Sequence, residues 1–371
     1  MKGFVSLHTR IQQYTKWLND KNIDFSFITS TPNVFYLSKF YSNPHERLLG
    51  IGIFANEEPF LVCPKMEVGQ ARAAGWDFEI IGYSDTENPW QFMQESIQKR
   101  NVTVNSCAIE SSHLTYERSE QLRHILGGAT FISAEEKLHY MRMVKDDQEI
   151  SILREAAKLA DFGVEVGVSA LASGKTEMEV LAQIEFELKK KGIREMSFST
   201  MVLYGEKSAD PHGNPGLKKL ANGDFVLFDL GVVLDGYCSD ITRTVAYGDV
   251  SDKQKEIYNT VLKAEVSALE ACKIGTRIGD LDKIARGIIT EAGYGEYFPH
   301  RLGHGLGIDV HEFPSMNETN NDLLQEGMTF TIEPGIYVPS VGGVRIEDDV
   351  LITKDGYESL TQFPKELQII K

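Results

Sequence analysis

Residues 225–244 read Phe225-Val-Leu-Phe-Asp229-Leu-Gly-Val-Val-Leu-Asp235-Gly236-Tyr-Cys-Ser-Asp240-Ile-Thr-Arg-Thr244. Two apolar runs are joined here by Asp-Gly, and this pattern predicts a β-hairpin. Folding back at the turn should place Asp229 and Asp240 nearly opposite each other on adjacent strands. Opposed side chains share one face of a sheet, with Cβ atoms about 4.5–5.5 Å apart. We therefore expect the two carboxylates to converge.

A second pair of acidic residues repeats this arrangement near the C-terminus. Glu333 ends the run Thr329-Phe-Thr-Ile-Glu333, and Glu347 lies in Val344-Arg-Ile-Glu347-Asp-Asp. The turn-forming segment Pro339-Ser-Val-Gly-Gly343 separates them, which predicts another hairpin. Both acids should again lie on one face.

His304 lies between the two hairpins in the sequence, within Gly303-His-Gly-Leu-Gly307. The flanking glycines allow the backbone to approach a site closely. Four converging carboxylates would repel one another unless cations lay among them, and the alternative is protonation with raised pKa values. Oxygen ligands with one imidazole suit Mn²⁺, Co²⁺, Fe²⁺ or Zn²⁺. Two such ions, about 3.5–4 Å apart, could share a hydroxide and polarise a carbonyl group.

Four further residues are candidates for contacts with a substrate. His300 and His311 flank His304 in the sequence, and His212 lies in the loop Asp210-Pro-His-Gly-Asn-Pro215. Loops of this kind commonly present side chains to ligands. Arg345, two residues before Glu347, shares the same strand face. It could orient a carboxylate ligand or hold an anionic group of the substrate.

The chain length predicts two domains, because 371 residues exceed the roughly 250–300 that one hydrophobic core usually serves. We expect the domains to span residues 1–135 and 136–371. In the first, helices alternate with strands and Thr31-Pro-Asn33 predicts a turn, so the domain should be α/β. In the second, helices at 146–171, 178–191, 251–272 and 279–292 should cover a curved, mainly antiparallel sheet, so its class should be α+β.

Composition excludes several other classes of protein. The net charge of −16 argues against nucleic-acid binding. No apolar segment approaches the roughly 18 residues of a membrane span, and the first residues do not resemble a signal peptide. The four cysteines are scattered, as in a protein with reduced thiols. These features predict a cytoplasmic protein that binds no membrane.

The combined motifs resemble the metallopeptidase family that contains methionine aminopeptidase, aminopeptidase P and prolidase. The resemblance covers about residues 145–368 and implies a C-terminal domain of pita-bread fold. The leading domain resembles the creatinase-type domain of the proline-directed branch, in which a histidine also stands four residues before the metal-binding one, as His300 does here. Creatinase shares this layout but does not keep the metal ligands, and all five are present in this chain.

The resemblance also implies a role for each residue of the site. Two divalent metal ions per chain are expected, with Mn²⁺ the first choice. Asp229 would bind one ion, His304 and Glu333 the other, and Asp240 and Glu347 would bridge both. Glu333 would also accept a proton from water, and a metal-bridged hydroxide would attack the carbonyl of an Xaa-Pro bond. His212 and His311 would hydrogen-bond the substrate or the tetrahedral intermediate. His300 would help shape the part of the site that holds the proline.

Three functions are compatible with these motifs. The leading prediction is an Xaa-Pro dipeptidase, or prolidase, acting on small Xaa-Pro peptides. The alternative within the same enzyme class is Xaa-Pro aminopeptidase (aminopeptidase P), which takes longer peptides. A non-catalytic peptide-binding relative is the alternative from another class, and the intact ligand set argues against it. Relatives with this layout are commonly homodimers, so we expect a homodimer.

Overall fold

The computed structural model describes residues 7–371, and these divide along the chain into two compact units, residues 7–142 and 143–371. The expected domain boundary between residues 135 and 136 lies at the start of helix α6 (Glu135–Met143) and stays a prediction. Within residues 7–371, no helix is both long enough and apolar enough to cross a membrane.

The N-terminal unit is built on a mixed six-stranded sheet in the order β4-β3-β2-β1-β5-β6. Strand β1 pairs antiparallel with β2 and parallel with β5, so the expected α/β class is confirmed. Its strands are β1 (Phe25–Ile28), β2 (Gly50–Phe54), β3 (Phe60–Pro64), β4 (Glu79–Tyr83), β5 (Ser106–Ile109) and β6 (Thr130–Ser133). Its helices are α1 (Leu7–Asp20), α2 (Thr31–Ser38), η1 (Lys65–Glu67), α3 (Val68–Ala73), α4 (Pro89–Lys99) and α5 (Tyr116–Ile125).

Helix α2 corrects the expectation of a turn at Thr31-Pro-Asn33. Ser30 caps the helix by accepting a hydrogen bond from the backbone N–H of Asn33, and Pro32 lies in the first turn. Proline is tolerated there because its missing N–H has no helical partner to lose. The same residues that favour a turn therefore begin a helix.

The C-terminal unit contains four long helices at the predicted places, each within two residues of its expected ends. They are α7 (Asp147–Ala170), α8 (Glu177–Lys190), α9 (Asp252–Glu270) and α10 (Ile278–Glu291). Reciprocal side-chain caps begin α7, α8 and α9, which fixes their first turns. Two short helices, η2 (Gly205–Ala209) and η3 (Gly295–Tyr297), complete the helical part of the unit.

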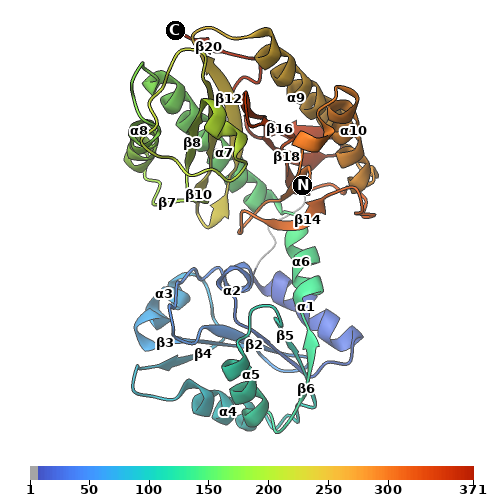
Figure 1. Ribbon diagram of the computed structural model, residues 1–371. Coiled ribbons are helices and arrows are strands. Elements are labelled where there is room, and N and C mark those ends of the chain that lie inside the picture. The colour runs from blue at the N-terminus through green and yellow to red at the C-terminus, as the bar shows by residue number, and fades with distance from the viewer. Residues whose placement is uncertain (1–6) are drawn as a thin grey trace. The chain divides into compact units, whose positions relative to one another are not determined.

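Two principal sheets carry these helices, and helices α7 and α8 lie on the opposite side of the unit from α9 and α10 (Figure 1). Helices α7 and α8 share a core with a four-stranded sheet in the order β20-β12-β9-β8. Helices α9 and α10 share a core with a five-stranded sheet in the order β14-β13-β15-β18-β19. All pairings within the unit are antiparallel except that of β12 with β20, as expected for the predicted α+β class.

The strands of this unit are short and number fourteen among the described residues. In the first half they are β7 (Glu195–Met196), β8 (Met201–Tyr204), β9 (Phe225–Leu230), β10 (Val232–Leu234), β11 (Tyr237–Cys238) and β12 (Ile241–Tyr247). In the second half they are β13 (Gly303–Gly305), β14 (Glu312–Met316), β15 (Thr329–Ile332), β16 (Gly335–Val338), β17 (Gly342–Arg345), β18 (Asp348–Thr353), β19 (Gly356–Ser359) and β20 (Ile369–Ile370).

The first predicted hairpin is present, but its register differs from the expected one. Asp235 and Gly236 both have positive φ, as a two-residue hairpin turn requires. Because this turn pairs Leu234 with Tyr237, the register along β9 and β12 places Thr242 opposite Asp229. Asp240 is therefore displaced by two residues from the predicted position. It keeps the same face of the sheet, since side chains alternate with a period of two.

The second predicted hairpin is divided between two sheets, and the division lies at its acidic residues. Strands β15 and β18 pair Ile332 with Asp348, and β16 and β17 pair Gly335 with Arg345. Both pairings follow one register, which places Glu333 opposite Glu347 at the junction between the five-stranded sheet and the two-stranded one. This register agrees with the expected opposition of the two acids, although their own backbone N–H groups donate to Leu302 and Thr242.

Candidate metal centre

One cavity of about 390 Å³ in the C-terminal unit is lined by every residue that the sequence proposed for the site. These residues are Asp229, Asp240, His304, Glu333, Glu347, His212, His300, His311 and Arg345. Five more complete the lining: Phe198, Met201, Pro211, Arg301 and Val310. Residues more than 130 positions apart in the sequence therefore meet around one small volume.

His304 is held on a strand that only glycine neighbours allow. It lies in the middle of β13, between β14 and β15. A Cβ atom on Gly303 would come within 2.0 Å of the Thr331 carbonyl oxygen, and one on Gly305 within 2.0 Å of the Phe313 carbonyl oxygen. The glycines thus let three strands approach closely enough for the imidazole to reach the cavity.

The predicted ligand atoms lie close together. The Nε2 atom of His304 is 3.4 Å from Glu333 Oε1 and 3.7 Å from Asp240 Oδ2. Asp240, His304 and Glu347 each offer one ligand atom within 4.8 Å of the others. Metal–ligand bonds are about 2.0–2.2 Å long, so one cation could contact these atoms after small adjustments.

Two oxygen atoms in the site are buried without a hydrogen-bond partner among residues 7–371, namely Oδ1 of Asp229 and Oδ1 of Asp240. Leaving such atoms unpaired costs free energy, since they have lost their contacts with water. Cations would supply the missing interaction for both atoms. The donor set, four carboxylates and one imidazole, therefore fits divalent metal ions.

Burial shifts the pKa values of these groups strongly. Burial raises the pKa values of Asp240 and Glu347 well above their usual range, and neighbouring carboxylates raise them further. Burial also raises the pKa of Glu333 to about 7, against the opposing charge of Arg345. The pKa of His304 falls to about 3 because of burial and the nearby His311. Without cations, the site therefore holds protons on its carboxyl groups. Protonation was the alternative to bound cations that the sequence analysis left open.

These shifts predict how the stability of the metal-free protein depends on pH. A carboxyl group with a raised pKa stabilises the fold below its unfolded pKa, and this contribution is lost as pH rises through the folded pKa. For Glu333 the window runs from about 4.3 to about 7. His304 has the opposite effect, but only below about pH 6.5, because above it the imidazole is neutral in both states. Asp240 and Glu347, whose pKa values are raised well above the usual range, extend this loss above pH 7. We therefore expect the unfolding temperature of chelator-treated protein to fall between pH 6.5 and 8.

Differential scanning fluorimetry in EDTA measures this prediction. With Mn²⁺ in place of EDTA the fall should disappear, because cations favour the ionised carboxylates. A chelated protein whose unfolding temperature is constant or rises over this pH range would contradict it.

Arg345 makes contacts that favour the first of its two predicted roles, the orientation of a carboxylate ligand. Its Nη2 atom forms an ion pair with Oδ2 of Asp229. Its Nε donates to the Thr242 hydroxyl at 3.0 Å, and that hydroxyl donates to Oε2 of Glu347 at 2.5 Å. One buried guanidinium thus supports two predicted ligands, one directly and one through Thr242.

His300 uses both of its ring nitrogens within the protein. Arg345 donates to the hydroxyl of Tyr337 at 2.9 Å, so the tyrosine proton points to Nε2 of His300, 2.8 Å away. Nδ1 then carries the proton and donates to the Arg301 carbonyl at 2.8 Å. Burial lowers the pKa of His300 to about 4, which keeps the ring neutral. His300 therefore has no free ring N–H to offer to a ligand in the cavity.

The other two histidines are more accessible. His212 and His311 are exposed residues that line the cavity. His311 also packs edge-on against His304, with ring centroids 4.1 Å apart. Both are therefore placed to reach a ligand in the cavity, as their predicted roles require, and the roles themselves stay predictions.

Sequence reasoning did not identify Arg301 and Met201, which line the cavity, or Tyr337, which does not line it but contacts His300 and Arg345. Tyr337 and Arg301 lie in the same short segments as the predicted ligands Glu333 and His304. That closeness in sequence was the signal that could have identified them. Met201 gave no local signal. It reaches the site because β8 pairs with β9 and places it opposite Asp229, and this depends on sheet formation alone.

Comparisons with known proteins identify the family of each part of the chain. Residues 151–354 match the metallopeptidase family M24, and residues 10–144 match the creatinase/prolidase N-terminal domain. A Bacillus subtilis protein named "Putative dipeptidase YkvY" is 63% identical over 97% of this chain and 99% of its own length.

Two solved structures share the whole two-domain architecture. The Xaa-Pro dipeptidase from Bacillus anthracis is 35% identical, with a TM-score of 0.92 over 98% of this chain and 100% of its own. The prolidase from Pyrococcus horikoshii OT3 is 38% identical, with a TM-score of 0.89 over 97% of this chain and 99% of its own. The fold expected from the sequence, a pita-bread domain after a creatinase-type domain, is thereby confirmed.

Proposed function

Because the chain belongs to metallopeptidase family M24, we propose that it is a metal-dependent Xaa-Pro dipeptidase that hydrolyses small Xaa-Pro peptides. The observation that carries this proposal is the cavity in which four acids, four histidines and Arg345 converge. The Xaa-Pro dipeptidase from Bacillus anthracis, which matches the whole chain, supports the choice of substrate.

Divalent ions held by Asp229, Asp240, His304, Glu333 and Glu347 would supply an activated water and polarise the carbonyl of the scissile bond. An Xaa-Pro bond is a tertiary amide without an N–H, so an enzyme cannot grip it through that proton. Divalent ions held in this cavity would act on the carbonyl group and on water instead, and need no such grip. The family chemistry and the substrate class therefore agree.

Glu333 is our candidate for the proton acceptor, because its carboxylate accepts no short hydrogen bond within residues 7–371 and is more exposed than that of Asp240. Asp229 is held by Arg345, and Glu347 is held by Thr242 at 2.5 Å. The hydrogen bond of Glu333 with the Thr331 hydroxyl is long, at 3.4 Å. Its side chain is 16% exposed, compared with 6% for Asp240. A carboxylate that is loosely held and open to the cavity can receive a proton and release it again.

The exposed His212 and His311 would hydrogen-bond the substrate carbonyl or the tetrahedral intermediate. His300 would form part of the proline pocket, because an imidazole with both nitrogens engaged offers a flat surface to the pyrrolidine ring. Phe198, Met201 and Val310 add apolar surface to the same cavity. Ligand pockets are mostly apolar with a few placed polar groups, as here.

The size of the cavity favours a dipeptide over a longer peptide. Its volume of about 390 Å³ is near the small end of the usual 300–1,000 Å³ range. We therefore expect Ala-Pro to be cleaved with a higher kcat/KM than Ala-Pro-Ala, and Ala-Ala to be a poor substrate. Assays with each peptide and with Mn²⁺, Co²⁺, Fe²⁺ and Zn²⁺ supplied singly measure this.

Each alternative function has its own outcome in these assays. Preference for Ala-Pro-Ala would identify an aminopeptidase P instead of a dipeptidase. Failure to cleave any Xaa-Pro peptide with any of the metals would favour the non-catalytic peptide-binding relative. Mn²⁺ as the native metal, a homodimeric assembly and a cytoplasmic location also belong to the proposal, and metal analysis of purified protein, light scattering and cell fractionation test them.

A further inference from the structure

Three acidic residues stand in a row at the second hairpin, and the proposed function uses one of them. Glu347, Asp348 and Asp349 are all buried, with exposed fractions of 2%, 0% and 1%. Glu347 lines the cavity, whereas Asp348 and Asp349 are not among the lining residues. Burying two more carboxyl groups beside the site costs free energy unless they are paired, so their contacts need an explanation.

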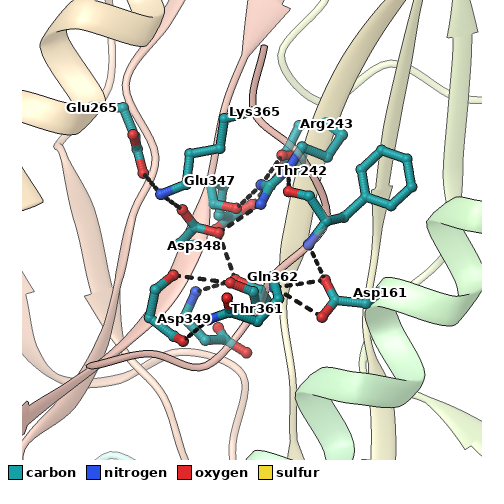
Figure 2. A network of polar contacts seen from close by, with 12 residues as sticks. Asp161, Thr242, Arg243, Glu265, Glu347, Asp348, Asp349, Thr361, Gln362 and Lys365 are labelled. Atoms are coloured by element: carbon teal, nitrogen blue, oxygen red, sulfur yellow. Dashed lines mark hydrogen bonds and ion pairs between the residues drawn. The ribbon is translucent and has the colours of Figure 1, made fainter. Parts of the chain in front are cut away.

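Asp348 is neutralised by a buried cation that also holds the main chain. Its Oδ1 accepts from Nη2 of Arg243 at 2.7 Å. Nη1 of the same guanidinium donates to the carbonyls of Glu347 at 2.6 Å and Thr242 at 3.0 Å. Figure 2 shows Asp348 between Arg243 and Lys365. This ion pair therefore fixes the place where β12 crosses the segment that carries Glu347.

Asp349 lies beside this ion pair and is connected to it through Thr361. The Thr361 hydroxyl accepts from the backbone N–H of Asp349 at 3.2 Å and donates to Oδ1 of Asp348 at 2.6 Å (Figure 2). The backbone N–H of Leu360 also donates to the Asp349 carbonyl at 2.8 Å. The main chain of Asp349 is thus anchored on both of its polar groups.

The side chain of Asp349 reaches back to the first hairpin. Its Oδ2 accepts from the backbone N–H of Asp240 at 3.0 Å, across 109 positions of sequence. Its Oδ1 is buried and has no hydrogen-bond partner among residues 7–371. Within the described part of the chain, the one hydrogen bond that the Asp349 carboxylate accepts therefore comes from the main chain of a predicted bridging ligand.

We infer that Asp349 is a positioning residue of the metal centre, which holds the main chain of Asp240 so that its carboxylate faces that of Glu347 before metal binds. The inference rests on the proposed metal centre and extends it beyond the ligands. The carboxyl carbon of Asp240 is three bonds from its backbone nitrogen, so a shift of that nitrogen also moves the carboxylate. Metal sites tolerate deviations of only about 0.2 Å in ligand distance, so a loss of this anchor should weaken binding. Loss of an outer-shell contact typically costs about 10–100-fold in metal affinity.

Calorimetric titration of metal-free protein with Mn²⁺ tests this inference without relying on turnover. We expect Asp349→Ala to weaken Mn²⁺ binding by about 10–100-fold. Asp349→Asn should stay close to the wild type, because its amide oxygen can still accept the Asp240 N–H. Val350→Ala is the matched control, since Val350 is the next buried residue of β18 and belongs to the core under α9 and α10. It should lower the unfolding temperature and leave Mn²⁺ affinity unchanged.

Each outcome separates this inference from the proposed function. A wild-type protein that binds no Mn²⁺, Co²⁺, Fe²⁺ or Zn²⁺ would overturn the metal centre and the inference together. If the wild type binds Mn²⁺ and a folded Asp349→Ala variant binds it with equal affinity, the inference is overturned and the metal centre is not. An equal loss of affinity in Val350→Ala would have the same consequence, because it would indicate a general effect of stability. If Asp349→Ala does not fold, Asp349→Ser replaces it, because its side chain is too short to keep the contact.

Discussion

Glu333→Gln should lower kcat for Ala-Pro by at least about 10³-fold while the protein stays folded. Glutamine has nearly the same volume and keeps an oxygen at the ligand position, but it cannot accept a proton. General-base catalysis alone contributes about 10²–10⁴-fold, and loss of a charged ligand adds to this. The variant should also unfold at a temperature similar to or above that of the metal-free wild type, because one of four repelling carboxylates is gone.

Steady-state kinetics and thermal unfolding of the same preparation measure both parts of this prediction. Glu318→Gln is the matched control, since Glu318 is an exposed residue between β14 and β15 and does not line the cavity. It should keep wild-type activity. Turnover near the wild-type rate in Glu333→Gln would remove Glu333 as the proton acceptor and leave the metal ligands to be tested separately.

Asp240→Asn should reduce Mn²⁺ affinity more than the loss of an outer-shell contact does, because Asp240 is itself a predicted ligand. Loss of an outer-shell contact typically costs about 10–100-fold. Asp240 is buried, its Oδ1 has no partner among residues 7–371, and its pKa is raised by burial and then by Glu347 and Asp229. A neutral amide cannot bridge two cations as a carboxylate does. The metal-free wild type must protonate this buried carboxyl group on folding, because its pKa is raised, and a neutral amide avoids that cost. The metal-free variant should therefore be at least as stable as the metal-free wild type.

The prediction is therefore that Mn²⁺ affinity falls while the stability of the metal-free protein stays the same or rises. Titration calorimetry gives the first quantity, and thermal unfolding in EDTA gives the second. Asp235→Asn is the control in the same hairpin, because Asp235 lies exposed at the turn and asparagine accepts its positive φ of 48°. If Asp240→Asn instead destabilises the metal-free protein and binds Mn²⁺ normally, Asp240 is a structural residue and not a ligand.

The first hairpin illustrates how far local sequence determines the site. The Asp235-Gly236 turn and the apolar runs beside it predicted the pair β9 and β12 correctly. The predicted opposition of Asp229 and Asp240 was wrong by two residues, because the turn has two residues and pairs Leu234 with Tyr237. Asp240 still reached the cavity, since a displacement of two residues preserves the face of the strand.

Helix α2 is a segment where the local sequence led to the wrong prediction, a turn instead of a helix. Ser-Thr-Pro-Asn is compatible with a turn and with a capped helix start, because both use the same side-chain hydrogen bond. The next residues of the chain decide between the two, and among them Val34 and Leu37 are fully buried in the N-terminal unit. Tertiary burial of the helix, rather than the propensity of its first residues, decided the structure.

The sequence by itself determined the four long helices, both acidic hairpins and the identity of the nine candidate residues, because these depend on periodicity, turn chemistry and spacing within short segments. Only the tertiary structure decided how the hairpins meet. Thr242 and Glu347 are 105 positions apart, and Asp240 and Asp349 are 109 apart. The contacts of Arg345, Tyr337 and Asp349 arise where two separately predicted elements cross, and no pattern within either element encodes that crossing. Local rules therefore supplied the chemical groups of the site, and packing of the sheets supplied their positions.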